Sequence, residues 1–201
     1  MARTQTESGT ARVAWDNPAL RFEGHSRAPA SAVYDLLADL QSHLEWSGRR
    51  QSESTRLLTM TAPPGPAGVG TEFHTTGTDG KTARWSDRSV VTEARRPSVF
   101  EFVTEGRRES KPGSQPWLMT MVHRYEIASH GSGSHVTYTE EVTRWSGGPR
   151  ILRTRLVSRL LFRMSAKYMR RGFDNLLAMA EELQPSANPT RMGESERENV
   201  E

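Results

Sequence analysis

The chain has 201 residues, of which 34% are hydrophobic and 25% are charged, which suits one globular domain and is short for two. It contains no cysteine, so disulfides, thiolate nucleophiles and cysteine-ligated zinc or iron–sulfur clusters are excluded. The formal net charge of +3 suits a protein that meets acidic partners, but by itself it does not indicate nucleic acid.

The two ends of the chain differ from its middle. Residues 1–18 are rich in Thr, Ser, Gly and Arg, and residues 185–201 carry prolines and scattered charge with almost nothing apolar. This composition predicts disordered tails on either side of a domain over residues 19–184. The first residues lack the apolar core of a secretory signal, and no stretch approaches the length of about 18 apolar residues that spans a membrane. We therefore expect a cytoplasmic protein.

The predicted elements begin with a strand over Leu20–Arg27, where apolar and polar residues alternate. A helix opens at Ala28-Pro29, because proline is tolerated in a first helical turn, and a short second helix passes through Leu44–Trp46. A run of strands follows, over Ser52–Met60, Val69–Thr76, Thr82–Glu93, Val99–Glu105, Trp117–Ile127 and His135–Trp145. Ile151–Leu183 is predicted to be one long helix, since its apolar residues recur at three- and four-residue steps.

This order of elements predicts the fold class. No helix separates the later strands, so the class is α+β. We expect a curved antiparallel sheet wrapped around a long C-terminal helix, with two short helices after the first strand. The gap between that helix and the concave face of the sheet is the natural place for a ligand cavity.

Several segments, in this order, also carry a family likeness. They are Ala28–Asp39 leading to Trp46, Gly68–Thr71, Val91–Glu93 with Pro97, Gly133–Thr137, and Phe173–Leu177 leading to Glu182-Leu183. Over 19–184 the chain resembles the START-related, birch-pollen-allergen-like helix-grip superfamily (SRPBCC), in its polyketide cyclase/dehydrase-like branch. The resemblance implies a helix-grip fold. It assigns no single function, because members include carriers, hormone receptors, cyclases, dehydratases and oxygenase subunits.

The last two strands carry the best candidate for chemistry. Trp117, Met119, Met121, His123, Tyr125 and Ile127 form the more apolar face of their strand, which we expect to face the helix. If Ile127 pairs with Val136, then Tyr125 lies opposite Tyr138, His123 opposite Glu140, Met121 opposite Val142, and Met119 opposite Arg144.

An inward pair of His123 and Glu140 would form a catalytic acid–base group. The carboxylate would fix the tautomer of the imidazole and raise its pKa, which gives a general base or acid. The alternatives are that the two groups only satisfy each other, or that they face outward after a register slip of one residue.

A second candidate lies in an earlier hairpin. The segment Gly77–Lys81 predicts a type I turn with a glycine bulge, which places Phe73 opposite Trp85 and Thr71 opposite Asp87, facing inward. Asp87 would then be a polar group in the pocket; its alternative is a solvated strand carboxylate. Tyr138, Asp87 or Arg144 could polarise a carbonyl. Tryptophan and methionine side chains make a deformable pocket for a flat or flexible ligand; the full set of expected ligand contacts is Trp85, Asp87, Trp117, Met119, Met121, Tyr125, Tyr138, Arg144 and Met164.

The motifs of common cofactors are missing. The histidines have no metal-ligand spacing, and neither a phosphate-binding loop nor a dinucleotide fingerprint occurs. We therefore expect neither a metal nor a cofactor.

The long helix begins with a strongly basic segment. Residues 150–171 contain basic residues and no acidic ones, and Arg155, Arg159 and Arg163 repeat every four residues on one face. A solvated outer face is the simplest explanation. The functional alternatives are docking to an acidic acyl carrier protein or to an anionic membrane surface. Nucleic acid is disfavoured, because no aromatic residues are interleaved on that face.

Three functions follow from these patterns. The first is binding of a hydrophobic small molecule, polyketide-like or lipid-like, and its cyclisation or dehydration by a cofactor-independent enzyme in which Glu140 orients His123. The second is a non-catalytic carrier or sensor with the same cavity. The third is an adaptor whose basic helix docks an acidic partner.

Overall fold

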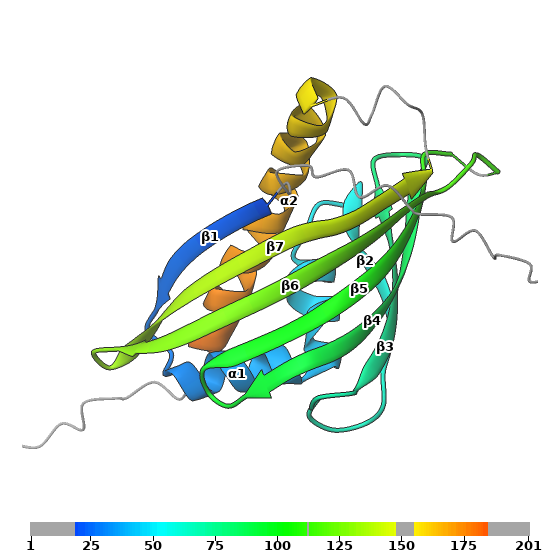
Figure 1. Ribbon diagram of the computed structural model, residues 1–201. Helices are drawn as coiled ribbons and strands as arrows, with labels where there is room; N and C mark the ends of the chain where they lie inside the picture. Colours follow the sequence, from blue (N-terminus) through cyan, green and yellow to red (C-terminus); the bar gives the residue numbers. More distant parts are fainter. Residues whose placement is uncertain (1–18, 112, 148–154, 185–201) are drawn as a thin grey trace, which may run out of the picture.

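A computed structural model describes residues 19–111, 113–147 and 155–184, with the backbone alone over 155–165 (Figure 1). Both predicted tails and the predicted start of the long helix at Ile151 lie outside this range. Within the range, the elements follow the predicted order. They are β1 (Ala19–Ser26), α1 (Ala30–Ala38), the short helical turns η1 (Leu40–Ser42) and η2 (Leu44–Arg49), β2 (Thr55–Thr61), β3 (Glu72–Asp79), β4 (Ala83–Arg95), β5 (Val99–Glu109), β6 (Trp117–His130), β7 (Gly133–Gly147) and α2 (Arg155–Glu182).

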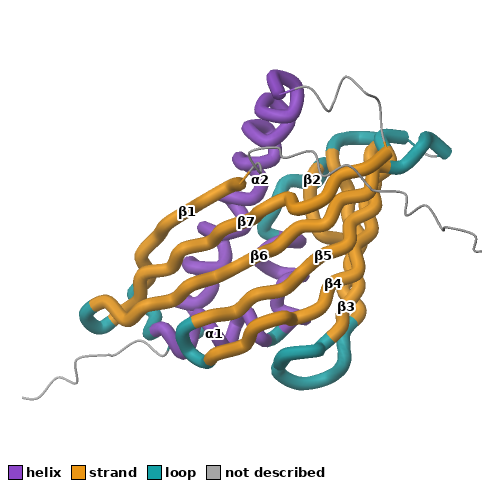
Figure 2. The backbone as a smooth tube through the Cα atoms, in the orientation of Figure 1, coloured by secondary structure: helices purple, strands orange, loops and turns teal. Residues whose placement is uncertain are grey.

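The strands form one antiparallel seven-stranded sheet in the order β1-β7-β6-β5-β4-β3-β2. The sheet curls, and α1 and α2 both lie on its concave side (Figures 1 and 2). The predicted α+β class, with a curled antiparallel sheet and a C-terminal helix, is confirmed. Among the described helices, none has the length and apolar character needed to cross a membrane.

The α1 segment ends without orphaned carbonyl groups. Ser42 Oγ donates to the Leu36 carbonyl at 2.7 Å, and His43 Nε2 donates to the Leu37 carbonyl at 3.0 Å. The Ala67 amide donates to the Ala38 carbonyl at 2.8 Å, which ties the loop after β2 to the helix. These contacts satisfy the acceptors that a helix end otherwise leaves unpaired, so this corner of the fold is fixed.

Helix α2 is held against the sheet by apolar packing and by one asparagine. Phe173, Leu176, Leu177 and Ala180 are buried in the core. A Cβ atom at Gly24 of β1 would lie 2.6 Å from Leu177 Cδ1, so α2 crosses β1 closely and a side chain at this position would force Leu177 to shift. Asn175 Nδ2 donates to two carbonyl groups around η2, at 3.0 and 3.1 Å. The helix is therefore locked to both the sheet and the η2 segment.

The register of β6 and β7 agrees with the prediction over most of its length. Tyr125 lies opposite Tyr138, His123 opposite Glu140, and Met121 opposite Val142. The prediction fails beyond Met121, where a β-bulge shifts the register. Met119 pairs with Trp145, and Arg144 lies opposite Thr120 and is exposed. The extra residue of a bulge moves every later side chain by one position, so Arg144 does not face Met119.

The register predicted for β3 and β4 is wrong. Phe73 lies opposite Ser89, Thr75 opposite Asp87, and Gly77 opposite Trp85. Gly77 is part of the strand, and the turn falls on residues 80–82, where Gly80 has a φ of 71°. A Cβ atom at Gly77 would lie 2.0 Å from Trp85 Cζ2, so this glycine makes room for the indole. The observed register differs from the predicted one by an even number of residues. Asp87 therefore still points to the concave face, as predicted.

Candidate functional site

A group of polar side chains lies on the concave face of the sheet among apolar neighbours. Alternation along β4, β6 and β7 turns Asp87, His123, Tyr138 and Glu140 toward α2. Tyr138, His123 and Glu140 are buried, at 1%, 9% and 7% exposure, and Asp87 is partly buried. We call these four residues the concave-face cluster.

The hydroxyl group of Tyr138 lies between His123 and Glu140. Tyr138 Oη donates to Glu140 Oε2 at 2.9 Å, and it lies 2.8 Å from His123 Nδ1. Because the tyrosine donates its proton to the carboxylate, its oxygen accepts from Nδ1–H of the imidazole. His123 Nε2 is then the unprotonated nitrogen, and it forms no hydrogen bond with any described residue. The expected pair of His123 and Glu140 is thus a relay through a tyrosine, with 3.7 Å between Nδ1 and Oε2.

The electrostatic effect expected on His123 has the opposite sign. Burial lowers the pKa of His123 to about 4, and Phe102 stacks on its ring with the centroids 4.7 Å apart. Burial destabilises the charged imidazolium form of His123 more than the nearby Glu140 carboxyl stabilises it, because that carboxyl is itself removed from water and less ionised. The prediction that Glu140 raises the pKa of His123 is therefore wrong. The neutral imidazole can accept a proton at Nε2, while its own proton stays on Nδ1 in the hydrogen bond to Tyr138.

The two carboxyl groups of the cluster resist ionisation. Burial raises the pKa of Glu140, and the hydrogen bond from Tyr138 offsets only part of that effect. Burial and, second, the charge of Glu140 raise the pKa of Asp87 to about 7. Asp87 forms no hydrogen bond or ion pair within the described residues. It leans over Gly106 of β5, where a Cβ atom would lie 2.9 Å from Asp87 Oδ1.

Helix α2 contributes Tyr168, which the sequence pattern assigns only to an apolar helical stripe. Tyr168 Oη donates to the Ser47 carbonyl at 3.3 Å. Burial raises the pKa of Tyr168, and the charges of Asp87 and Glu140 add to the rise. A small cavity of about 20 Å³ lies beside it, which is room for one water molecule; its lining is Trp46, Ser47, Gln51, Tyr125, Tyr138, Tyr168, Met169, Gly172 and Phe173.

An aromatic rim continues the concave face beyond Asp87. Trp117 and Trp145 stack with their ring centroids 6.0 Å apart, and Arg108 lies over Trp117 at 5.7 Å. Arg108 forms an ion pair with Asp79. Sequence reasoning missed Trp145 and Arg108; the bulge that turns Trp145 inward left no composition signal. Trp85, Trp117, Met119 and Met121 are partly buried here, and their role as ligand contacts stays a prediction.

Other predicted residues lie elsewhere. Arg144 is on the outer side of the sheet, and the side chains of Met164, Arg155, Arg159 and Arg163 lie outside the described part of the chain. The predicted docking role of Arg155, Arg159 and Arg163 therefore stays a prediction. Within the described residues, no three His, Asp or Glu side chains are placed to hold a metal ion.

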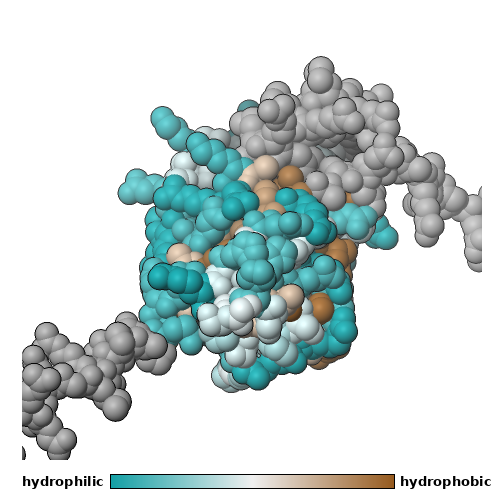
Figure 3. Space-filling model, turned by 90° about the vertical axis from the view of Figure 1, so that its left-hand side faces the viewer, coloured by the Kyte–Doolittle hydropathy of each residue, from teal (hydrophilic) through white to brown (hydrophobic). Residues whose placement is uncertain are grey.

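Two surface features complete the description. A groove of about 740 Å³ lies between α1 and the loop after β2, and Tyr34, Asp35, Asp39 and Arg96 contribute polar groups to it. None of the predicted site residues lines this groove. From the side of β1, the described surface is largely hydrophilic, with smaller hydrophobic areas among the hydrophilic residues (Figure 3).

No protein-family model and no curated protein matches the chain. Solved bacterial structures do share its fold. A protein from Rhizobium leguminosarum aligns with a TM-score of 0.59 and 13% identity, covering 83% of this chain and 95% of that one. A Chromobacterium violaceum protein gives 0.55 and 14%, covering 81% and 96%. An Arthrobacter aurescens protein gives 0.55 and 13%, covering 87% and 92%. At such identities the similarity concerns the fold alone.

Proposed function

We propose that this chain is a helix-grip protein of the START-related superfamily that binds a hydrophobic small molecule, polyketide-like or lipid-like, between α2 and the concave face. The curled sheet crossed by α2 and the family resemblance over residues 19–184 support the fold assignment. One observation carries the function: the unpartnered carboxyl of Asp87 lies on the same buried face as the His123–Tyr138–Glu140 relay. A face built only for packing would have apolar groups there.

The cluster contains both halves of an acid–base catalyst. His123 Nε2 is an acceptor, because the relay holds the proton of the neutral imidazole on Nδ1. Asp87, with a pKa of about 7, holds a proton in about half of the molecules near neutral pH, which suits a general acid. In a dehydration, His123 takes a proton from the carbon beside a carbonyl, Asp87 gives its proton to the departing hydroxyl, and water leaves. The carbon–oxygen bond breaks as the carbon–carbon double bond forms.

The test begins with the full chain purified from its own host. Native mass spectrometry detects any bound compound, which is identified after release and then offered to the wild type, to His123→Ala and to the control His74→Ala. His74 is exposed on the outer face beside Glu72, so its loss should not alter turnover. We expect conversion by the wild type and the control, and none by His123→Ala.

The other outcomes are equally informative. A hydrophobic compound that binds and is released unchanged makes the chain a carrier or sensor that uses the same concave face. Conversion that survives in His123→Ala rules out the mechanism. The binding proposal itself fails if the concave face takes up no hydrophobic compound, whether from the host or as an added alkyl probe.

A further inference from the structure

The two carboxyl groups of the concave-face cluster lack a basic partner among the described residues. Asp87 has no hydrogen bond or ion pair there. Glu140, whose side chain is 9% exposed, is bonded only through Oε2 to Tyr138, and the imidazole at 3.7 Å is neutral. Buried carboxyl groups are normally paired or hydrogen-bonded on both oxygens, because an uncompensated one costs stability. The arrangement therefore leaves both oxygens of Asp87 and Oε1 of Glu140 without a hydrogen-bond donor among the described residues.

The described side chains of the surrounding elements do not supply the missing positive charge. The nearest guanidinium on β5, that of Arg108, is engaged by Asp79 of β3 and by the Trp117 ring. The described titratable or charged side chains on the concave side of these strands and on the facing part of α2 are Asp79 on β3, Arg108 on β5, His123 and Tyr125 on β6, Tyr138 and Glu140 on β7, and Tyr168 on α2. Apart from Arg108, each of these is neutral or acidic near neutral pH.

Aromatic rings form the rest of the surroundings. Trp85 is two residues from Asp87 on the same face of β4, and Phe102 stacks on His123. Tyr125 and Tyr138 lie with their centroids 4.7 Å apart. Aromatic faces attract cations, most strongly where water is excluded. Carboxyl oxygens with aromatic walls match a protonated nitrogen, which offers both positive charge and several N–H donors.

We propose that the hydrophobic ligand of the concave face carries a protonated amine, which Asp87 and Glu140 bind from two sides. The inference rests on the proposed function for the existence of the hydrophobic site only. An Asp87 carboxylate that holds an ammonium group is ionised and has no proton to donate, so an amine ligand would assign the site to binding and not to the dehydration. A neutral hydroxyl group can hydrogen-bond to a carboxyl group in either protonation state, whereas an ammonium group needs the carboxyl groups ionised. Amine binding should therefore weaken as pH falls, while alcohol binding should change little.

Octylamine and 1-octanol separate these classes, because they share a chain and differ in the polar end. Binding to the full chain is followed by calorimetry and by tryptophan fluorescence, since Trp85, Trp117 and Trp145 line the site. At pH about 8 we expect octylamine to bind about tenfold to a hundredfold more tightly than octanol, as hydrogen bonds to charged groups warrant. At pH about 5.5 the preference shrinks, because Asp87 gains a proton while the amine stays charged.

Variants assign the preference to the cluster. Asp87→Asn and Glu140→Gln should each remove most of it, while Glu105→Gln, which neutralises an exposed outer-face carboxylate, should keep it. Equal affinity for both probes at each pH overturns the amine inference and leaves the hydrophobic site standing. An amine preference that survives in the Asp87→Asn, Glu140→Gln double variant also overturns it. If neither probe binds, the proposed function fails together with the inference.

Discussion

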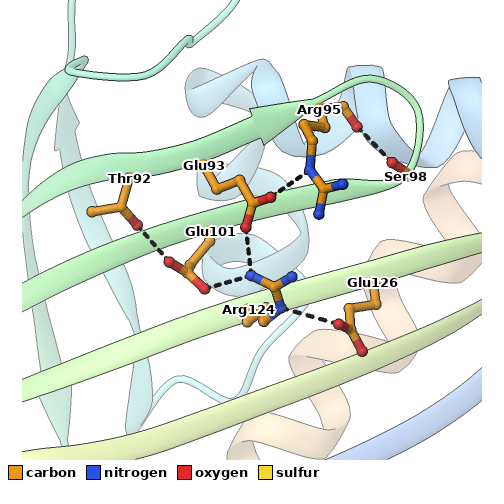
Figure 4. Close-up of polar contacts among 7 residues, drawn as sticks. All are labelled: Thr92, Glu93, Arg95, Ser98, Glu101, Arg124 and Glu126. Carbon is orange, nitrogen blue, oxygen red and sulfur yellow. Dashed lines mark hydrogen bonds and ion pairs between the residues drawn. The ribbon is translucent and has the colours of Figure 1, made fainter.

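The two faces of one sheet treat carboxyl groups in opposite ways. On the outer face, Arg124 Nη1 lies 2.6 Å from Glu93 Oε2 and 2.7 Å from Glu101 Oε2, and its Nε reaches Glu126 (Figure 4). The hydrogen bond from Arg124 lowers the pKa of Glu93. On the concave face, burial raises the pKa of both Asp87 and Glu140. The same residue types are thus held ionised on one face and pushed toward neutrality on the other.

The two faces therefore differ in how their carboxyl groups affect the stability of the fold. Exposed ion pairs stabilise a protein slightly, whereas an unpaired carboxyl in a desolvated site destabilises it. Unpaired, desolvated carboxyl groups with raised pKa values concentrate at functional sites. The comparison therefore points to the concave face as the part of the molecule that binds or reacts.

The largest expected effect comes from Asp87→Asn. The pKa of Asp87 is about 7 in the folded protein against an ordinary value of 3.8, so the folded state keeps a proton that the unfolded chain releases. Wild-type stability should fall as pH rises from about 4 to about 7, by on the order of 4 kcal/mol, and should not change further for this reason outside that window. Urea unfolding at several pH values should show Asp87→Asn more stable than wild type at pH about 8 and equal at pH about 4.

Outer-face Glu105→Gln serves as the control for that experiment. A difference between Asp87→Asn and wild type that does not vary with pH would mean that Asp87 is not desolvated.

Tyr138→Phe should produce the next largest effect. The substitution leaves the Nδ1–H group of His123 and Glu140 Oε2 without their hydrogen-bond partner. The free energy of unfolding should therefore fall by about 1–3 kcal/mol. Tyr125→Phe is a matched control, because Tyr125 is also buried and its hydroxyl has no hydrogen bond within the described residues. Equal losses for the two variants would refute the relay.

Gly106→Ala tests how Asp87 is positioned. The new methyl group would lie 2.9 Å from Asp87 Oδ1 and 3.1 Å from Met121 Cε, and both are flexible side-chain atoms. We expect a loss of about 1 kcal/mol from local overpacking and a weaker octylamine preference, because the carboxyl must move. A variant with unchanged amine preference would show that the position of Asp87 is immaterial.

The smallest effect should come from Arg124→Met on the outer face. Partly exposed ion pairs contribute little, so we expect a loss within about 1 kcal/mol at neutral pH. Because the pKa of Glu93 is lowered by its partner, the loss should be present above the ordinary glutamate pKa and fade as pH falls through the folded-state value. A larger loss, undiminished by salt, would mean that the outer network is more than a surface feature.

The sequence predicted those features of the fold that depend on periodicity. Alternation and three- to four-residue spacing identified the strands and α2, and the tight hairpin between β6 and β7 fixed the pairing of His123 with Glu140. The predicted strand registers were wrong where a single residue determines the pairing. The bulge before Arg144 leaves no mark in composition, and Gly77 reads as a turn residue although it lies beneath the Trp85 ring.

The site was predictable in its residues but not in its chemistry. Strand alternation alone turned Asp87, His123 and Glu140 to one face. The order of hydrogen bonds through Tyr138, and the sign of the pKa change at His123, depend on side-chain length and on desolvation. Tyr168 reaches the cluster from a helix far along the chain, so no local pattern could reveal it.

The most direct test of the central claim is a carbon-13 NMR titration of the side-chain carboxyl groups, with Asp87 assigned by its absence in Asp87→Asn. If the concave-face carboxyl is desolvated and unpaired, its resonance titrates with a midpoint near 7, while that of Glu93 titrates below the ordinary glutamate value. An Asp87 midpoint at about 4 or below would show a solvated or paired carboxylate, and would contradict the assignment of the concave face as the site.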